Sequence, residues 1–289
     1  MMARLAPAKI NLYLHVAAPD ARGYHPLQSL VVFADIGDYV ALQPTVDGLA
    51  LHIEGPFGRG LTAGEDNLVM RAVRAFEAEA DLSVDRHQIL LRKNLPLASG
   101  LGGGSADAGA CLHLLRQTYA PDMSDGTLSK LAGGLGADGV MCLWHKSGVA
   151  DGYGEKLTYR HMPTVHAVLV NPLAQCSTAK VYAGYDDRGQ FAPLMPQKSF
   201  GSIVNIDKLV SALSHTRNDL QGPAMRLQPM IATVLAHLEA QPETLFARMS
   251  GSGATCFALC EDAQAAETLR LKLLSLMPDA WVRTCCLGG

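Results

Sequence analysis

A glycine-rich run in the first half of the chain constrains its structure most strongly. Residues 95–111 read LPLASGLGGGSADAGAC and place four glycines directly before a segment with helical periodicity. The apolar stripe of that segment consists of Cys111, Leu112, Leu115 and Tyr119. A glycine loop that opens onto a helix N-terminus offers unpaired N–H groups and the positive end of the helix dipole, which together suit a phosphate. A flexible connector is the alternative, but the proline before the glycines favours an anion cradle.

Two other phosphate-binding patterns are rejected. A P-loop needs a Gly-Lys pair, and this chain contains none. A GxGxxG pattern spans residues 134–139, but it follows a predicted helix over 128–135 and precedes a predicted strand over 140–144. A dinucleotide-binding turn needs the opposite order. We expect the helix after the glycine run to be capped by Ser105 or Ser99.

Size and composition indicate one large domain or two ordinary ones. The chain has 289 residues, of which 48% are hydrophobic, and a net charge of −3. This charge gives no general attraction to nucleic acid or to acidic membranes. The seven cysteines form no CxxC pair, and the N-terminus has no apolar signal sequence. We therefore predict a cytoplasmic protein with reduced thiols, free of membrane and nucleic-acid partners.

The first predicted strand spans residues 9–16, where apolar and polar residues alternate. Its polar face carries Lys9, Asn11, Tyr13 and His15. Because edge strands commonly turn polar residues to water, solvent exposure is the default interpretation of Lys9 and Asn11.

The remaining pattern predicts the α+β class. Further strands are predicted over 29–33, 39–43, 88–92 and 167–171. Further helices are predicted over 67–80, 230–239 and 263–276. Residues 248–259 indicate a second glycine turn that leads into a strand, and 186–202 a long surface loop. The pattern restarts near 160, so we expect an N-terminal domain over 1–160 and a C-terminal domain over 161–289.

Two further features have ordinary and functional interpretations. Asp138 lies in a Gly-Ala-Asp-Gly turn, where aspartate is frequent for conformational reasons alone. Tyr24 and His25 are adjacent in a predicted loop, where simple packing would account for them.

Three motifs in this order resemble the GHMP kinase superfamily, which includes galactokinase, homoserine kinase and mevalonate kinase. The matching segments are residues 7–11 (PAKIN), 96–106 (PLASGLGGGSA) and 250–255 (SGSGAT). The resemblance implies a two-domain fold, with a ribosomal-protein-like N-terminal domain, a ferredoxin-like C-terminal domain and the site in the cleft between them.

Within the superfamily, the chain most resembles the branch that acts on a cytidine-diphosphate-linked methylerythritol in non-mevalonate isoprenoid synthesis. The stretches that carry this likeness are residues 8–12, 22–28, 65–68, 135–138 and 152–155. The resemblance implies ATP-dependent phosphorylation of the 2-hydroxyl of that substrate by a monomer or weak dimer.

The resemblance also implies roles for individual residues. Asp138 is the catalytic carboxylate, Lys9 is its cationic neighbour, and Asn11 positions the substrate. Tyr24, His25 and Tyr182 are expected to hold the cytosine.

The nucleotide residues follow from the same likeness. The nucleoside of ATP is expected beside Asn67 and Lys93. The rest of the ATP site is expected to comprise Pro96, Ser99, Gly100, Leu101, Gly102, Gly103, Gly104 and Ser105. Mg²⁺ is expected to bridge phosphate oxygens, with no protein ligand assigned.

The chain departs from the family pattern after Asp138, where Gly139 and Val140 stand in place of Val-Pro, and we expect this to loosen the local backbone. Asn94 stands where a basic residue is frequent. The alternatives are another GHMP kinase of the homoserine or mevalonate type, a non-catalytic ligand sensor of the same fold, and a nucleic-acid-binding module. The acidic net charge argues against the last.

Overall fold

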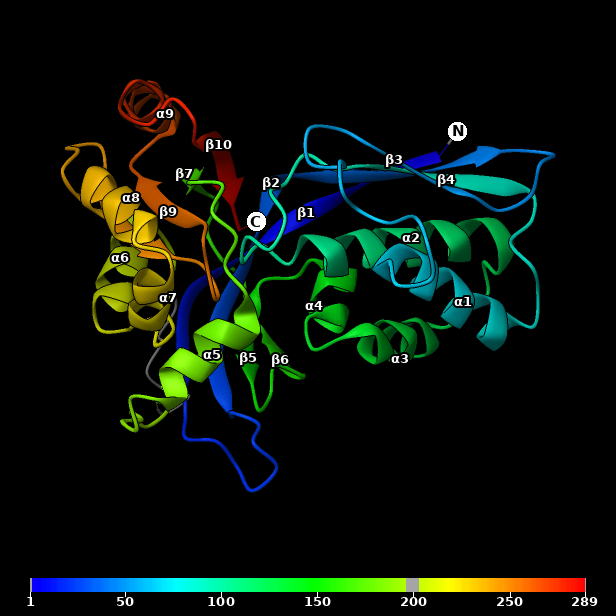
Figure 1. Cartoon of the computed structure of the whole chain (residues 1–289), viewed down its shortest axis with the longest axis horizontal. Helices are drawn as coiled ribbons and strands as arrows, with labels where there is room; N and C mark the ends of the chain where they lie inside the picture. Colours follow the sequence, from blue (N-terminus) through cyan, green and yellow to red (C-terminus); the bar gives the residue numbers. More distant parts are fainter. Residues whose placement is uncertain (1, 196–202, 289) are drawn as a thin grey trace. The chain divides into compact units, whose positions relative to one another are not determined.

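A computed structural model describes residues 2–195 and 203–288, which form two compact units with mixed helix and sheet content (Figure 1). The first unit comprises residues 1–9, 36–95 and 102–145. The second comprises residues 10–35, 96–101 and 146–289. Strands β1 (Met2–Val16) and β2 (Leu27–Pro44) therefore contribute residues to both units. The predicted α+β class is confirmed.

In the first unit, helices cover one side of a small sheet (Figure 1). Its sheet order is β3-β4-β2, where β3 is Leu51–Glu54 and β4 is His87–Arg92. Strand β3 is parallel to β4, and β4 is antiparallel to residues 39–44 of β2. The helices are α1 (Leu68–Ala80), α2 (Gly103–Tyr119), α3 (Asp125–Leu135) and α4 (Gly139–Trp144).

Helix α1 forms where the sequence predicts it. Its buried positions are Val69, Met70, Ala72, Val73 and Phe76, one face of a helix. That face packs against α2. The predicted helices at α2 and α3 are also confirmed.

The strand predicted over 140–144 is wrong, because these residues form helix α4. A short apolar run has the same appearance in a buried strand and in a buried helix, so the pattern could not separate the two. Contact with α3 favours the helix: a Cβ on Gly139 would lie 1.9 Å from the carbonyl oxygen of Ala132. The GxGxxG pattern at 134–139 therefore lies between two helices, without the preceding strand that a dinucleotide site needs.

The second unit is built on an antiparallel sheet in the order β10-β7-β9-β8. These strands are β7 (Val165–Asn171), β8 (Phe246–Met249), β9 (Cys256–Cys260) and β10 (Trp281–Leu287). A hairpin of β5 (Gly148–Asp151) and β6 (Lys156–Tyr159) pairs with residues 29–31 of β2. The helices are α5 (Thr178–Asp186), α6 (Ile206–Ser214), α7 (Gln221–Leu227), α8 (Met230–Glu239) and α9 (Ala263–Leu276).

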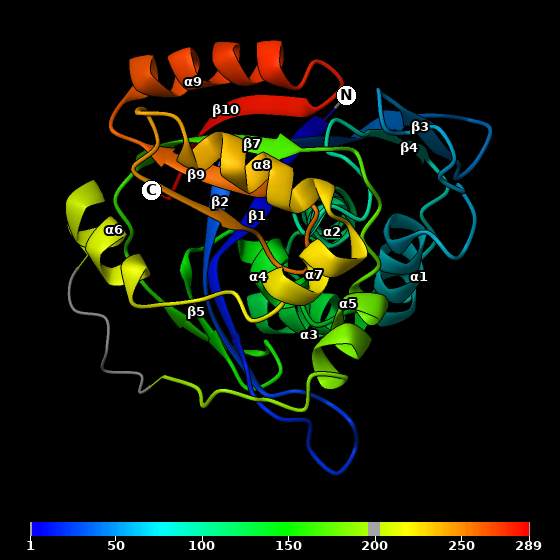
Figure 2. The same ribbon diagram turned by 60° about the vertical axis from the view of Figure 1, so that its left-hand side comes forward.

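Helices α8 and α9 both pack on this sheet (Figure 2), and both have the predicted bounds. The predicted glycine turn and strand over 248–259 are confirmed by β8, the turn and β9. The strands predicted over 29–33 and 39–43 are parts of the single strand β2, and β3 was missed.

The loop predicted over 186–202 is only partly described. Residues 187–195 have no regular secondary structure beyond a turn, whereas Asp186 ends α5 and residues 196–202 lie outside the described residues. Across 2–195 and 203–288, none of the helices combines the length and the apolar character needed to span a membrane.

Candidate active site

The glycine-rich run leads into the first turn of α2. Gly102 is the N-cap in the left-handed conformation, with φ of 64° and no side-chain cap hydrogen bond. The N–H groups of Gly103, Gly104 and Ser105 therefore lie in the turn where a helix offers no acceptor of its own. A Cβ on Gly102 would lie 3.2 Å from Cβ of Lys9, so only glycine fits here easily. This turn has the free donors and the dipole end that bind a phosphate.

The predicted serine cap is wrong. Ser105 lies inside the first turn, and Gly102 takes the cap position because glycine adopts a positive φ without strain. Ser99 is buried and lies before the helix, between the buried side chains of Pro96 and Leu101. The buried side chains of Pro96 and Leu101 anchor the segment, so the loop offers backbone atoms to a ligand.

The part of the run in the second unit, residues 96–101, contacts the second glycine turn. The backbone N–H of Thr255 donates to the carbonyl oxygen of Ser99 at 3.1 Å. The hydroxyl of Ser250 donates to the carbonyl oxygen of Gly100, also at 3.1 Å. A Cβ on Gly100 would lie 2.4 Å from the carbonyl oxygen of Ser250. Two of the three motif segments therefore meet within one unit.

Lys9 and Asp138 form an ion pair in the first unit. Lys9 projects from β1, and its Nζ lies 2.7 Å from Oδ2 of Asp138 at the start of α4. The two side chains differ in exposure, at 8% for Lys9 and 36% for Asp138. Burial alone lowers the pKa of Lys9, but the Asp138 carboxylate and the Cys142 sulfur outweigh it, so this pKa stands above its ordinary value. The pair thus presents a carboxylate that is open to solvent and held by a buried, charged ammonium.

The solvent-exposed interpretation of Lys9 and Asn11 is wrong, because both faces of β1 are buried from Ala6 to Val16. The Nδ2 of Asn11 donates to the hydroxyl of Ser29 at 2.7 Å. Its Oδ1 is buried and has no hydrogen-bond partner among the described residues. A buried amide with one free acceptor can receive a proton donor from a ligand.

The backbone beside Asp138 is tightly packed, contrary to the expectation of a loosened turn. Gly139 has no room for a side chain, because the backbone of α3 lies against it. Its N–H donates to the carbonyl oxygen of Gly136 at 2.9 Å, which closes a turn across Asp138. Glycine is needed here for close approach, so the carboxylate has a fixed position.

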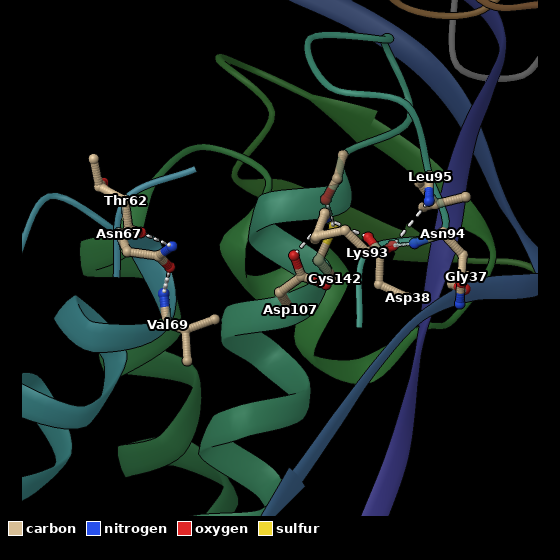
Figure 3. A network of polar contacts seen from close by, with 11 residues as sticks. Gly37, Asp38, Thr62, Asn67, Val69, Lys93, Asn94, Leu95, Asp107 and Cys142 are labelled. Carbon is tan, nitrogen blue, oxygen red and sulfur yellow. Dashed lines mark hydrogen bonds and ion pairs between the residues drawn. The ribbon is translucent and has the colours of Figure 1, made fainter. Parts of the chain in front are cut away.

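Asn67 caps α1 (Figure 3). Its Oδ1 accepts from the N–H of Val69 at 2.9 Å, and its Nδ2 donates to the carbonyl oxygen of Thr62 at 2.8 Å. Both ends of the amide are thus used to fix the loop before α1 and the first turn of that helix.

Lys93 lies at the centre of a buried cluster that sequence reasoning missed (Figure 3). Its ammonium forms ion pairs with Asp38 of β2 and with Asp107 of α2, the latter at 2.6 Å. All three side chains are at least 96% buried. Oδ1 of Asp38 also accepts from the backbone N–H groups of Asn94 and Leu95, at 2.5 and 2.9 Å. One lysine therefore joins strand β2, the loop after β4 and helix α2.

The two carboxylates of this cluster have unequal surroundings. Asp38 receives one ammonium and two backbone donors, whereas Asp107 receives the ammonium only, and its Oδ1 has no partner among the described residues. Burial and the Asp38 carboxylate together outweigh the opposing effect of Lys93, so the pKa of Asp107 is raised to about 7. Asp107 is therefore the carboxylate of this cluster with the fewer stabilising donors.

His25 lies in an aromatic cluster of the second unit. Its Nδ1 lies 2.8 Å from the carbonyl oxygen of Ala17, and its Nε2 lies 3.0 Å from Oδ1 of Asp186. The rings of Tyr182 and Tyr185 have centroids 5.3 and 5.9 Å from that of His25. Two residues predicted for the same ligand, His25 and Tyr182, are therefore neighbours.

Tyr24 is much more exposed than His25, at 63%. Its ring meets that of Tyr153 edge to face, with centroids 6.2 Å apart, and the guanidinium of Arg22 lies 5.7 Å from its centroid. An exposed ring held by its neighbours can stack on a flat ligand at little entropic cost.

The structure offers no protein cage for a metal within residues 2–195 and 203–288, where no three His, Cys, Asp or Glu side chains are grouped suitably.

Family models and solved structures match this chain along most of its length. The GHMP kinase N-terminal domain matches residues 67–146, and the GHMP kinase C-terminal model matches residues 196–279. A 4-diphosphocytidyl-2-C-methyl-D-erythritol kinase from Caulobacter sp. (strain K31) is 48% identical over 98% of this chain and 97% of its own. The same-named protein of Parvibaculum lavamentivorans is 40% identical over 98% and 97%.

A solved 4-(cytidine 5'-diphospho)-2C-methyl-D-erythritol kinase is 32% identical, covers both chains completely and has a TM-score of 0.77. A homoserine kinase from Cytophaga hutchinsonii shares the fold, with a TM-score of 0.66 at 18% identity. The chain belongs to the GHMP kinase family, and the expected two-domain fold of that family is confirmed.

Proposed function

We propose that this chain transfers the γ-phosphoryl group of ATP to the 2-hydroxyl of 4-diphosphocytidyl-2-C-methyl-D-erythritol. The observation that carries the proposal is the Lys9–Asp138 ion pair, a solvent-open carboxylate held by a buried ammonium. The names of the relatives supply the substrate. The compartment we propose is the cytoplasm, because six of the seven cysteines are buried free thiols, which suits a reducing environment.

Phosphoryl transfer requires alignment and charge stabilisation more than covalent help. In the proposal, the N–H groups of Gly103, Gly104 and Ser105 and the helix dipole hold the ATP phosphates. The segment with Pro96, Ser99, Gly100, Leu101 and Gly102 carries the chain into that turn. Mg²⁺ would be held by phosphate oxygens and water, and its charge would offset part of the negative charge of the phosphates.

Asp138 accepts the proton of the substrate hydroxyl as the bond to phosphorus forms. The charged ammonium of Lys9 holds the carboxylate in place, and it also stabilises negative charge that develops on the transferred group. Asn11 would orient the substrate through its free Oδ1, which can accept a hydrogen bond from a hydroxyl.

We propose that His25, Tyr24 and Tyr182 bind the cytosine, because the ring of Tyr182 lies beside the buried imidazole of His25 and the adjacent Tyr24 presents an exposed ring. Asn67 and Lys93 are proposed near the ATP nucleoside. Their polar groups already bond to the protein, so their contribution would be to shape the site through α1 and α2.

A coupled assay tests the function directly. ATP with the cytidyl substrate should give ADP, whereas homoserine and mevalonate should give none above background. CMP and CDP should compete with the cytidyl substrate. Turnover of homoserine or mevalonate at comparable kcat/KM would assign the chain to another GHMP kinase, and absence of turnover with every acceptor would favour a non-catalytic sensor.

The cytosine assignment has its own prediction. His25→Ala should raise the KM for the cytidyl substrate by about tenfold or more, because the imidazole held by Ala17 and Asp186 is the centre of the aromatic cluster proposed for the base. The KM for ATP should change by less than about twofold by the same reasoning. Leu271→Ala, on the exposed face of α9, is the matched control. Equal loss of ATP affinity in the His25 variant would reject this assignment.

A further inference from the structure

Asp107 has no role in the proposal so far, yet it lies on the helix that binds the phosphates. It follows Gly103 by four residues, so it stands one turn inside α2 on the same face as that glycine. A Cβ on Gly103 would lie 3.3 Å from Oδ2 of Asp38 and 3.4 Å from Nζ of Lys93. The first residue of the helix therefore rests directly on the buried ionic cluster.

The charges in this cluster do not balance. Two carboxylates share one ammonium, so the cluster carries a net charge of −1 when all three groups are ionised. It is neutral when Asp107 holds a proton. The unpartnered Oδ1 of Asp107 shows which carboxylate lacks stabilising donors.

Other groups face Asp107 from the elements packed around it. From its own helix comes the thiol of Cys111, and from α4 comes the thiol of Cys142, and burial raises the pKa of both. Lys9 of β1 is engaged with Asp138. Helix α1 contributes apolar side chains to its contact with α2. Lys93 and Asp38 are therefore the groups whose charge acts most strongly on Asp107.

We propose that Asp107 is a positioning residue for the nucleotide, which takes up a proton when a triphosphate binds at the N-terminus of α2. A triphosphate bound one helical turn from Asp107 is repelled by a net negative charge in the cluster. Protonation of Asp107 removes that charge. By linkage, the neutral carboxyl strengthens triphosphate binding, and the ionised one weakens it. The inference rests on the proposed role of this loop in holding ATP.

The direction with pH follows from the same linkage. Below neutral pH, Asp107 is protonated and the cluster is neutral, so ATP binds well. Above neutral pH, Asp107 ionises and the dissociation constant for ATP increases. Raising the pH from 6.5 to 8.5 should weaken binding by about threefold to tenfold through this group, the effect of roughly half to one pKa unit of coupling.

The experiment measures the dissociation constant for ATP by calorimetry at pH 6.5 and 8.5 for the full chain and for Asp107→Asn. The variant keeps the shape of the side chain and cannot ionise. Titration of ATP itself affects both proteins equally, so the proposal predicts that the variant loses the additional threefold to tenfold pH effect. Asp125→Asn, which removes an exposed carboxylate at the start of α3, is the matched control and should retain the effect.

A second measurement, on the unmodified protein, tests the proposal even if Asp107→Asn does not fold. Calorimetry of the unmodified protein at pH 7, in two buffers of different ionisation enthalpy, counts protons exchanged on binding. Uptake beyond that of ATP itself supports the proposal, and no uptake overturns it. An identical pH profile in Asp107→Asn and the unmodified protein also overturns it. The results that overturn this inference leave the proposed kinase function intact. Failure to bind ATP at any pH would instead reject the proposed function and this inference together.

Discussion

The first unit contains two lysine–aspartate clusters that differ in balance and in access to solvent. Lys9 pairs with one carboxylate, Asp138, which is more than a third exposed. Lys93 pairs with two carboxylates, and the whole cluster is almost completely buried. Both lysines have a raised pKa, because carboxylates outweigh the burial that would lower it. The lysines are thus alike, and the difference lies in their partners.

This difference separates chemistry from positioning. An exposed carboxylate can meet a substrate hydroxyl within hydrogen-bond reach, as proton transfer demands. A buried carboxylate cannot contact a substrate, but its charge still acts on the N-terminal turn of α2. The buried cluster also costs stability, because taking charges out of water is only partly offset by pairing them.

The largest effect is expected at the open pair. Asp138→Asn should lower kcat by roughly 10²–10⁴, because the proton acceptor is lost while the shape of the side chain is kept. Steady-state kinetics at saturating ATP and cytidyl substrate measures it. A reduction of less than threefold in the folded variant would remove Asp138 from the chemistry.

Removal of the two ammonium groups should affect stability very differently. Lys93→Met leaves two buried carboxylates without their counter-ion and should lower the free energy of unfolding by about 3–5 kcal/mol. Lys9→Met should cost about 1 kcal/mol or less, because the exposed Asp138 carboxylate regains water. Urea unfolding followed by circular dichroism gives both values. Equal losses would show that the two clusters do not differ as described.

The smallest effect concerns stability against pH. The pKa of Asp107 is raised to about 7 in the folded chain, so the folded state keeps a proton that the unfolded state releases above about pH 4. The contribution of this carboxyl to the free energy of unfolding is largest below that pH and is lost as the pH rises towards 7. Asp107→Asn should therefore be more stable than the unmodified protein by about 1–3 kcal/mol at pH 8, and equal to it near pH 4. Unfolding midpoints at the two pH values test this, and a stability difference that does not depend on pH would contradict it.

The sequence predicted much of the fold because long periodic segments were its clearest signals. Helices α1, α8 and α9 have apolar stripes over three or more turns. Short segments were less informative: α4 was predicted as a strand, and the four-residue strand β3 was missed. Their conformations depend on tertiary contacts, such as the approach of Gly139 to α3, which local sequence does not show.

The site was predicted through its motifs, and the structure adds what the motifs lack. Lys9 and Asp138 are 129 residues apart in the chain, and only the resemblance to GHMP kinases suggested that they would meet. Asp38 and Asp107 were missed, although Lys93, two residues from each of the buried Leu91 and Leu95, was a signal that a carboxylate must lie nearby. Which carboxylates those are depends on the packing of β2 and α2.

The most direct test combines ATP binding and phosphoryl transfer in two variants, Asp138→Asn and Asp107→Asn. The single-turnover rate and the dissociation constant for ATP are measured at pH 6.5 and 8.5. We predict that the first variant binds ATP normally and transfers the phosphoryl group at least about a hundredfold more slowly. The second should retain transfer within about threefold at saturating ATP and lose the additional pH dependence of binding. If the two variants showed the same pattern, the separation of chemistry from positioning would be contradicted.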